Sequence, residues 1–267
     1  MLQVFIFTVL FFIVSMIFSM FGLGGGLVYV PMLVLGGYPV KVASIISLFA
    51  ITLASSSAFI TFFRSGKFDW KLAAIIDPPT DIMAFVGGYY ANILDEHILN
   101  LTLVIVILVA GLLIIKQPKG SRSIKLKWGK FTWKRTFKNE IYQVNIPIVC
   151  FMTGLIGFFV GMVGATGGVF KIPIMVLLCG VPMDIAVGTS SGMVFLTAIF
   201  GLTGHLMTAN KINWLVMMLI SVACLVGGIL GAKISLKVDR KKLRLSYGFL
   251  MFMLAILTIL KRLFLPI

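Results

Sequence analysis

Residues 20–31 read MFGLGGGLVYVP, and residues 162–173 read MVGATGGVFKIP. In each stretch a cluster of glycines interrupts an apolar run, and a proline follows five residues after the last glycine. Glycine frees the backbone, and proline removes a backbone donor or starts a helix. Each stretch therefore predicts a helix that breaks and turns back as a short hairpin. We call residues 22–26 and 164–168 the glycine tips.

The composition places these hairpins in a membrane. The chain has 267 residues, of which 60% are hydrophobic and only 12% are charged, and its mean hydropathy is +1.11. A soluble domain has about 25% charged residues and could not hide this much apolar surface. A soluble enzyme, a disordered chain and a secreted disulfide scaffold are therefore excluded. At ~20 residues per span, the length allows about eight to ten spans.

Charge and cysteine content agree with this class. The formal net charge is +15, from 23 basic and 8 acidic residues, and the basic residues gather in a few loops. This distribution indicates that the basic residues set the membrane topology and contact anionic lipid headgroups, rather than bind nucleic acid.

The apolar run at 4–20 has no Lys or Arg before it and no small-residue cleavage site after it, so we predict a retained membrane helix. The three cysteines lie in apolar runs and are expected to be buried core residues.

The two halves of the chain repeat each other beyond the glycine tips. Matched pairs, at offsets rising from 142 to 144 residues, are Pro31 and Pro173, Pro39 and Pro182, Ala43 and Ala186, Ser47 and Ser190, and Trp70 and Trp214. A slow drift of this kind indicates short loop insertions in a duplicated unit of about 115 residues. We predict a first transmembrane repeat at 1–115, a basic linker at 116–143 and a second transmembrane repeat at 144–267.

Apolar runs predict the helices of an all-α polytopic membrane protein. They fall at about 4–21, 27–36, 41–63, 72–94, 98–115, 145–163, 169–179, 184–208, 214–236 and 244–264. The second and seventh are too short to span a bilayer alone. Each pairs with the preceding run as the broken hairpin.

Loop charges decide how the repeats are oriented. The linker 116–143 carries nine Lys or Arg and one Glu, so we expect it to be cytoplasmic. The loop 237–244 is also basic, yet its equivalent in the first repeat is the acidic loop 95–97. Equivalent loops of opposite charge are what inverted repeats produce. We predict two inverted repeats of about five helices each, whose hairpins meet near the membrane midplane. The alternative is eight spans in parallel repeats.

The glycine tips are the candidate substrate site. An unwound tip exposes the N–H groups of the helix that follows, and these groups and the helix dipole favour an anion. Two tips that meet near the midplane can form one site. The alternative is that the glycines only let helices pack closely. The candidate tip residues are Gly24, Gly25, Gly26, Thr166, Gly167 and Gly168.

Four side chains near the tips are further candidates. Ser47 and Ser190 occupy equivalent positions and carry neutral donors that could bind an anion without holding it too tightly. Lys171 follows the second tip in an apolar stretch, where a basic residue is costly and usually functional. Its repeat partner, Tyr29, can donate a hydrogen bond. The alternatives are interhelical hydrogen bonds for the serines and a lysine that snorkels to the interface.

Asp77-Pro-Pro-Thr-Asp81 is predicted to interrupt the fourth helix, because adjacent prolines unwind a helix locally. Carboxylates inside a membrane often carry protons or bind cations, so Asp77 and Asp81 are the candidate coupling residues, for a proton or for sodium. The alternative for Asp77 is a cap on a helix restarted by Pro78 near the inner interface. We expect no metal site and no cofactor, because metal-ligand spacing and a Walker motif are missing from the sequence.

The doubled motifs G-x-G-G-G-x(4)-P and G-x-T-G-G-x(4)-P, each followed by P-x(3)-A-x(3)-S, resemble the sulfite exporter TauE/SafE family over essentially the whole chain. The resemblance implies a small sulfur oxyanion or organosulfonate substrate, such as sulfite or sulfoacetate. We therefore expect a secondary transporter in the cell membrane, contacting lipid and a small anion but no nucleic acid. A second copy of the chain, in a homodimer, is a possible partner. The alternative functions are an anion channel of similar build and, with less support, a membrane enzyme or assembly factor.

Overall fold

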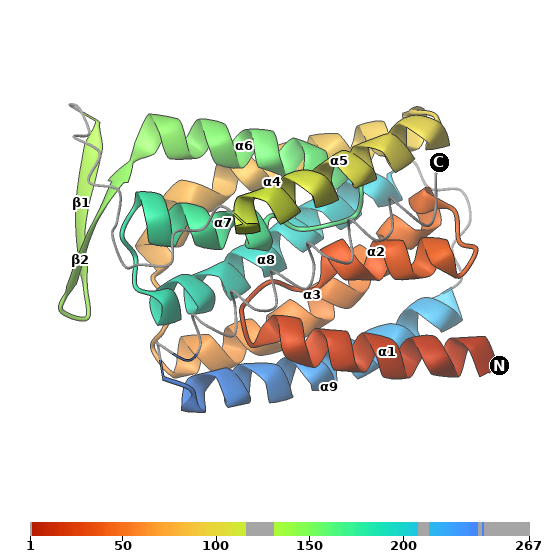
Figure 1. Ribbon diagram of the computed structural model, residues 1–267, viewed down its shortest axis with the longest axis horizontal. Helices are drawn as coiled ribbons and strands as arrows, with labels where there is room; N and C mark the ends of the chain where they lie inside the picture. The colour runs from red at the N-terminus through yellow and green to blue at the C-terminus, as the bar shows by residue number, and fades with distance from the viewer. Residues whose placement is uncertain (1, 116–130, 208–213, 240–241, 243–267) are drawn as a thin grey trace.

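The computed structural model describes residues 2–115, 131–207, 214–239 and 242. The chain forms a helical bundle with a small β-hairpin at one end (Figure 1). The elements are α1 (Leu2–Ser19), α2 (Gly26–Leu35), α3 (Val40–Arg64), α4 (Trp70–Ile93), α5 (Glu96–Ile115), β1 (Thr132–Phe137), β2 (Glu140–Asn145), α6 (Ile146–Met162), α7 (Gly168–Pro173), the π-helical turn η1 (Ile174–Leu178), α8 (Met183–Leu206) and α9 (Trp214–Lys237). The predicted helix at 244–264 and residues 116–130 of the predicted linker lie outside the described residues.

Every predicted apolar run from 4–21 to 214–236 is a helix whose ends differ from the prediction by at most two residues, with α7 and η1 together forming the seventh run. Val40–Arg64, Met183–Leu206 and Met217–Lys237 are long and apolar enough to cross a membrane, and shorter apolar helices accompany them in the described part of the chain. Large apolar side chains such as Phe151 and Leu215 are more than 70% exposed. An apolar outer surface of this kind is typical of a lipid-facing bundle, and the fold is that of a helical, multi-pass membrane protein.

The long helices pack across the two halves rather than within them. Helix α4 of the first half packs against α6 and α8 of the second. In the same way, α9 of the second half packs against α1 and α3 of the first, and α9 lies beside α1 in Figure 1. Helices α3 and α8, which occupy equivalent positions, contact each other. The two halves are therefore interleaved.

Helix α4 is continuous from Trp70 to Ile93, so the predicted interruption at Pro78 and Pro79 is wrong. The physical reason lies in the neighbouring helix. Pro79 cannot donate to the carbonyl of Ile75, and the thiol of Cys150 on α6 points at that oxygen over 3.5 Å. Thr153, one turn further along α6, donates to the carbonyl of the next residue, Ile76, over 3.1 Å. Donors from a packed neighbour let a membrane helix continue through proline.

Part of the predicted linker is an antiparallel β-hairpin, which the pattern of apolar runs does not predict. Strands β1 and β2 pair from Thr132 with Asn145 to Phe137 with Glu140. The two turn residues, Lys138 and Asn139, have φ of 48° and 64°. Positive φ at both central residues matches the twist of a two-residue hairpin turn. The hairpin projects at one end of the bundle (Figure 1).

Candidate functional site

The two glycine tips touch each other inside the bundle. A Cβ atom added to Gly26 would lie 2.9 Å from the Cα of Ala165, and one added to Gly168 would lie 3.2 Å from the Cα of Leu23. Both neighbours belong to the opposite tip, so the tips meet, as the sequence predicts. Glycine is also required for backbone shape in the first tip, because φ is 87° at Gly25, which caps α2.

Two equivalent serines fasten each tip to the opposite half. Ser47 on α3 donates to the carbonyl of Gly164 over 2.9 Å, and Ser190 on α8 donates to the carbonyl of Gly22 over 2.9 Å. Gly164 and Gly22 are themselves equivalent in the repeat and have φ of 68° and 65°. Ser47 and Ser190 therefore lie beside the first glycine of each tip, where their hydroxyls donate to a backbone carbonyl.

The tips present unpaired backbone donors. Within the described residues, the N–H groups of Gly24, Gly25, Thr166 and Gly167 have no hydrogen-bond acceptor. The backbone bonds of the preceding helices end with donors at Leu23 and Ala165, and those of the following helices begin with donors at Val28 and Phe170. The side chain of Thr166 instead faces the carbonyl of Leu23, at 3.4 Å. N–H groups ahead of a helix are the usual protein donors to a small anion.

Two equivalent apolar side chains close the space around the tips. Ile51 on α3 and Val194 on α8 occupy the same repeat position, one turn after Ser47 and Ser190. A Cβ atom at Gly24 would lie 2.6 Å from Val194 and 2.7 Å from Ile51. The tips are therefore packed between the two halves, with little space beside them.

Tyr29 and Lys171 lie under the two tips at equivalent positions. A Cβ atom at Gly25 would lie 2.7 Å from the Tyr29 ring, and one at Gly167 would lie 3.4 Å from Cε of Lys171. Tyr29 is fully buried and stacks on Phe11 with ring centroids 4.3 Å apart. The tyrosine side chain of Tyr29 therefore lies beneath the first tip, and the lysine side chain of Lys171 lies at the equivalent position beneath the second tip.

Lys171 is part of a buried polar group that we call the Lys171 cluster. Its ammonium pairs with Asp77 on α4 and donates to Thr197 on α8 over 2.9 Å. Thr197 also lies 2.7 Å from Oδ1 of Asp81. All four side chains are buried, with Lys171 and Thr197 at 0% exposure. The cluster consists of Lys171, Asp77, Asp81 and Thr197.

The Lys171 cluster contradicts the alternative interpretations of Lys171 and Asp77. Lys171 does not snorkel, and Asp77 lies inside a continuous helix rather than capping a new one, so both alternative interpretations are wrong. One substrate-binding candidate, Lys171, shares a network with the two coupling candidates, Asp77 and Asp81. Thr197 was not among the predicted site residues, and the signal for it is indirect: a buried lysine and buried carboxylates need polar partners.

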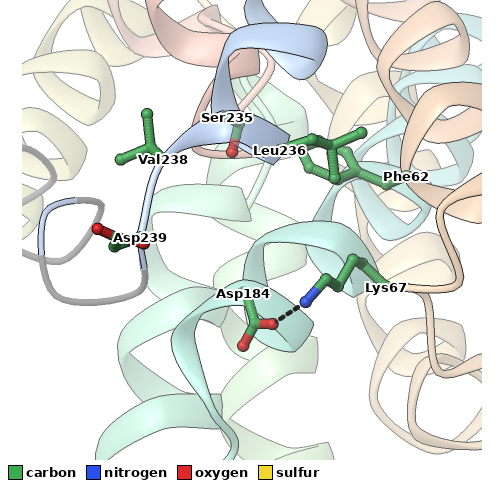
Figure 2. Close-up of a pocket in the computed structure, with 7 residues that line it drawn as sticks. All are labelled: Phe62, Lys67, Asp184, Ser235, Leu236, Val238 and Asp239. Carbon is green, nitrogen blue, oxygen red and sulfur yellow. Dashed lines mark hydrogen bonds and ion pairs between the residues drawn. The ribbon is translucent and has the colours of Figure 1, made fainter.

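A separate cavity of about 210 Å³ lies between the end of α3, the start of α8 and the end of α9 (Figure 2). Lys67 and Asp184 form an ion pair along its wall, as the dashed line in Figure 2 marks. The other lining residues are Phe62, Ser235, Leu236, Val238 and Asp239. The residues predicted at the tips do not line this cavity.

Asp69 joins the β-hairpin to the bundle. It caps α4 by accepting from the N–H of Lys71 over 3.1 Å, and it receives two 3.0 Å hydrogen bonds from Arg135 and one from the hydroxyl of Tyr142. Burial alone raises the pKa of Asp69, but the hydrogen bonds from Arg135 and Tyr142 outweigh it and lower that pKa below its ordinary value. Asp69 was not singled out from sequence, although an Asp directly before a helix is a recognisable cap.

The comparisons with known proteins agree with this architecture. The profile of the family described as sulfite exporter TauE/SafE matches residues 7–258. The probable membrane transporter protein YunE of Bacillus subtilis is 27% identical over 252 residues, covering 88% of this chain and 90% of the relative. The probable membrane transporter protein MJ0441 of Methanocaldococcus jannaschii is 30% identical over 254 residues, covering 88% and 87%. No solved structure matches. The chain belongs to the TauE/SafE family and is a membrane transporter rather than an enzyme.

Proposed function

We propose that this protein is a secondary transporter of a small sulfur-containing anion, such as sulfite, sulfoacetate or a related organosulfonate. The substrate binds between the two glycine tips, and the two halves move about it by alternating access. The family profile and the names of the relatives support a transporter. The sulfur anion follows from the family description and from the chemistry of the tips.

The observation that carries the proposal is that the two tips touch and that, within the described residues, each tip has two N–H groups without an acceptor, at Gly24 and Gly25 and at Thr166 and Gly167. These donors are neutral, so they can hold a sulfonate or sulfite and still release it. Lys171, under the second tip, adds a positive charge near the site. Ile51 and Val194 fill the space around the tips, which favours a carrier with a closed centre over an open anion channel.

We also propose that the two halves are inverted relative to each other. The N-terminus, where α1 begins, and the β-hairpin, after which α6 begins, lie at opposite ends of the bundle in Figure 1. The reciprocal bonds of Ser47 and Ser190 support a two-fold relation between the halves. In this arrangement the linker is cytoplasmic and the protein resides in the cell membrane. Proton or sodium coupling and a homodimer stay predictions.

The test is uptake into proteoliposomes that contain the purified chain. Sulfite, sulfoacetate, sulfate and taurine are offered as labelled substrates, with and without unlabelled substrate inside. We expect saturable uptake of a sulfur anion, accelerated by internal substrate, because a carrier exchanges substrates across the membrane. Flux that rises linearly with concentration and shows no exchange would favour the channel. The absence of flux for all sulfur anions would contradict the substrate class.

A further inference from the structure

The Lys171 cluster contains one basic and two acidic side chains in a buried place. Lys171 is 0%, Asp77 2% and Asp81 5% exposed. Asp77 and Asp81 lie four residues apart on α4, so their side chains lie on the same face of the helix. If all three groups were ionised, the cluster would bury a net charge of −1. Burying an unbalanced charge is far more costly than burying a neutral group.

The hydrogen bonds around Thr197 indicate which group removes this charge. A threonine hydroxyl has one proton to donate. Its oxygen accepts from Lys171 over 2.9 Å, and it lies 2.9 Å from the carbonyl of Met193, four residues earlier on the same helix. The carbonyl of Met193 cannot donate, and an ionised carboxylate cannot donate either, so the geometry allows the Thr197 proton to go to Met193 or to Asp81. Asp77 pairs with the ammonium of Lys171, whereas Asp81 contacts the neutral hydroxyl of Thr197 over 2.7 Å, so Asp81 is the carboxyl that is protonated at the lower cost.

We propose that Asp81 is the proton-binding residue of this transporter and that its proton and the substrate anion occupy the protein together. This inference rests on the proposed function, because it places the substrate at the glycine tips. Asp77 stays ionised as the partner of Lys171, and Asp81 carries the exchangeable proton. The proton comes from water on one side, forms an O–H bond to the Asp81 carboxylate and leaves to water on the other side. No electron is transferred.

The position of Lys171 connects the proton to the anion. Its Cε passes 3.4 Å from the place of a Cβ on Gly167, so the lysine spans from the second tip to the cluster. When Asp81 is protonated, the charges of Lys171 and Asp77 cancel and an anion at the tip meets no net repulsion. When Asp81 is ionised, the cluster is negative and opposes the anion. Binding of the proton therefore favours binding of the anion, and each promotes the other to the same extent.

Within the described residues, few other titratable groups face this part of α4. Cys150 on α6 points at the carbonyl of Ile75, below the cluster. His205 on α8 lies near Gly88 and contacts the carbonyl of Gly161, further along the helix towards its C-terminus. Neither shares a hydrogen bond with Asp81. Asp81 is therefore the group through which pH acts on this site.

The first experiment measures sulfoacetate binding to the full-length purified chain by calorimetry between about pH 5 and pH 9. Sulfoacetate keeps a constant charge over most of this range, since its carboxyl titrates near the pKa of an ordinary acid. We expect the affinity of the wild-type chain to fall about tenfold per pH unit once Asp81 ionises. In Asp81→Asn the amide is neutral at every pH and can donate to Thr197 as the carboxyl does. This variant should bind with a pH-independent affinity and lose proton-driven uptake.

The matched control is Asp95→Asn, which removes an exposed carboxylate and should behave as the wild-type chain. A pH-independent affinity in the wild-type chain, an unchanged slope in Asp81→Asn, or uptake driven by a sodium gradient alone would overturn the inference. Failure of sulfoacetate to bind at any pH would exclude sulfoacetate as the substrate but not the proton site, which the following measurement decides without any substrate.

A second measurement decides the proton site without any substrate. Infrared difference spectra between acidic and alkaline pH report the C=O stretch of protonated carboxyl groups. We expect a band in the wild-type chain and in Asp95→Asn that is missing in Asp81→Asn. A band of unchanged intensity in Asp81→Asn would show that the proton lies elsewhere and would overturn the inference, whatever the protein transports.

Discussion

Ser47 donates its hydroxyl proton to the carbonyl of Gly164 over 2.9 Å and so ties α3 of the first half to the glycine tip of the second half. Ser190 makes the equivalent bond to Gly22 in the other direction. Each half therefore holds the other half's tip in place. A transporter that works by rocking its halves must keep these bonds or exchange them as it moves.

Ser47→Ala and Ser190→Ala should each lower the free energy of unfolding by about 1 kcal/mol, because a buried carbonyl loses its donor and hydrogen bonds between membrane helices are of modest strength. Both should also weaken substrate binding, since the tips lose their fixed spacing. Thermal unfolding in detergent measures the first effect. Ser56→Ala, whose hydroxyl bonds only within α3, is the control and should change neither quantity. Wild-type stability in both variants would show that these bonds do not hold the tips.

Gly25→Ala and Gly167→Ala should differ, although the two positions are equivalent. Gly25 has a φ of 87°, and its Cβ would lie 2.7 Å from the Tyr29 ring, so Gly25→Ala should fold poorly. Gly167 has a φ of −71°, and its Cβ would approach no atom more closely than 3.2 Å. Gly167→Ala should therefore yield folded protein with weakened anion binding, because a methyl group stands beside the N–H groups.

Size-exclusion profiles and calorimetric anion titration check this pair of tip variants. Gly154→Ala is the control, because its Cβ would meet only ordinary contacts at 3.7 Å or more. Equal folding yields for Gly25→Ala and Gly167→Ala would mean that the left-handed backbone at the first tip is not required.

Lys171→Met should destabilise the protein by about 3–5 kcal/mol, because it leaves Asp77 buried without its partner. The double variant Lys171→Met, Asp77→Asn should recover most of that loss, since both charges are then removed. Thermal unfolding of the two single variants and the double variant measures the coupling. Additive losses in the double variant would mean that the ion pair contributes nothing.

The contact between the hairpin and the bundle should loosen in acid. The hydrogen bonds from Arg135 and Tyr142 lower the pKa of Asp69. They therefore stabilise the docked hairpin at and above the ordinary pKa of a carboxyl, and this stabilisation is lost as the pH falls through the lowered value. Asp69→Asn should remove it at every pH and speed hydrogen exchange in residues 132–145 about tenfold, which corresponds to about 1.4 kcal/mol. Glu140→Gln, at the far end of the hairpin, is the control. Unchanged exchange in Asp69→Asn would place the attachment elsewhere.

The helices and the tips could be predicted because their signals are local. A glycine cluster followed by proline specifies a break, and an apolar run of the right length specifies a helix. The ends of α1 to α9 therefore follow within two residues, when α7 and η1 are taken as one helix. The repeat offset also identified Ser47 and Ser190 as equivalent before their bonds were known. Their reciprocal bonding could not be predicted, because it joins residues 117 and 168 positions apart in the chain.

The predictions that were wrong concern residues whose local environment is set by partners far away in the chain. Pro78 and Pro79 ought to break a helix, but the carbonyl of Ile75, which Pro79 leaves without a donor, faces the thiol of Cys150, 75 residues later in the chain. Lys171 and Asp77 are 94 residues apart, so their pairing depends on how α4 docks against the second half. The hairpin in the linker did carry a local signal, in which Lys138-Asn139 separates two stretches rich in Thr, Trp, Phe, Ile, Tyr and Val. The excess of basic residues drew attention to topology instead.

The interleaving of the halves has a consequence for biosynthesis. Helix α4 leaves the ribosome before α6 and α8, which are its main packing partners, have been made. During that interval Asp77 lacks Lys171, and Asp81 lacks Thr197. The nascent first half must therefore remain in the membrane, or at the insertion machinery, while Asp77 and Asp81 lack their polar partners. Truncation after residue 115 should leave a fragment that quality-control proteases recognise, and co-expression of residues 116–267 should rescue it.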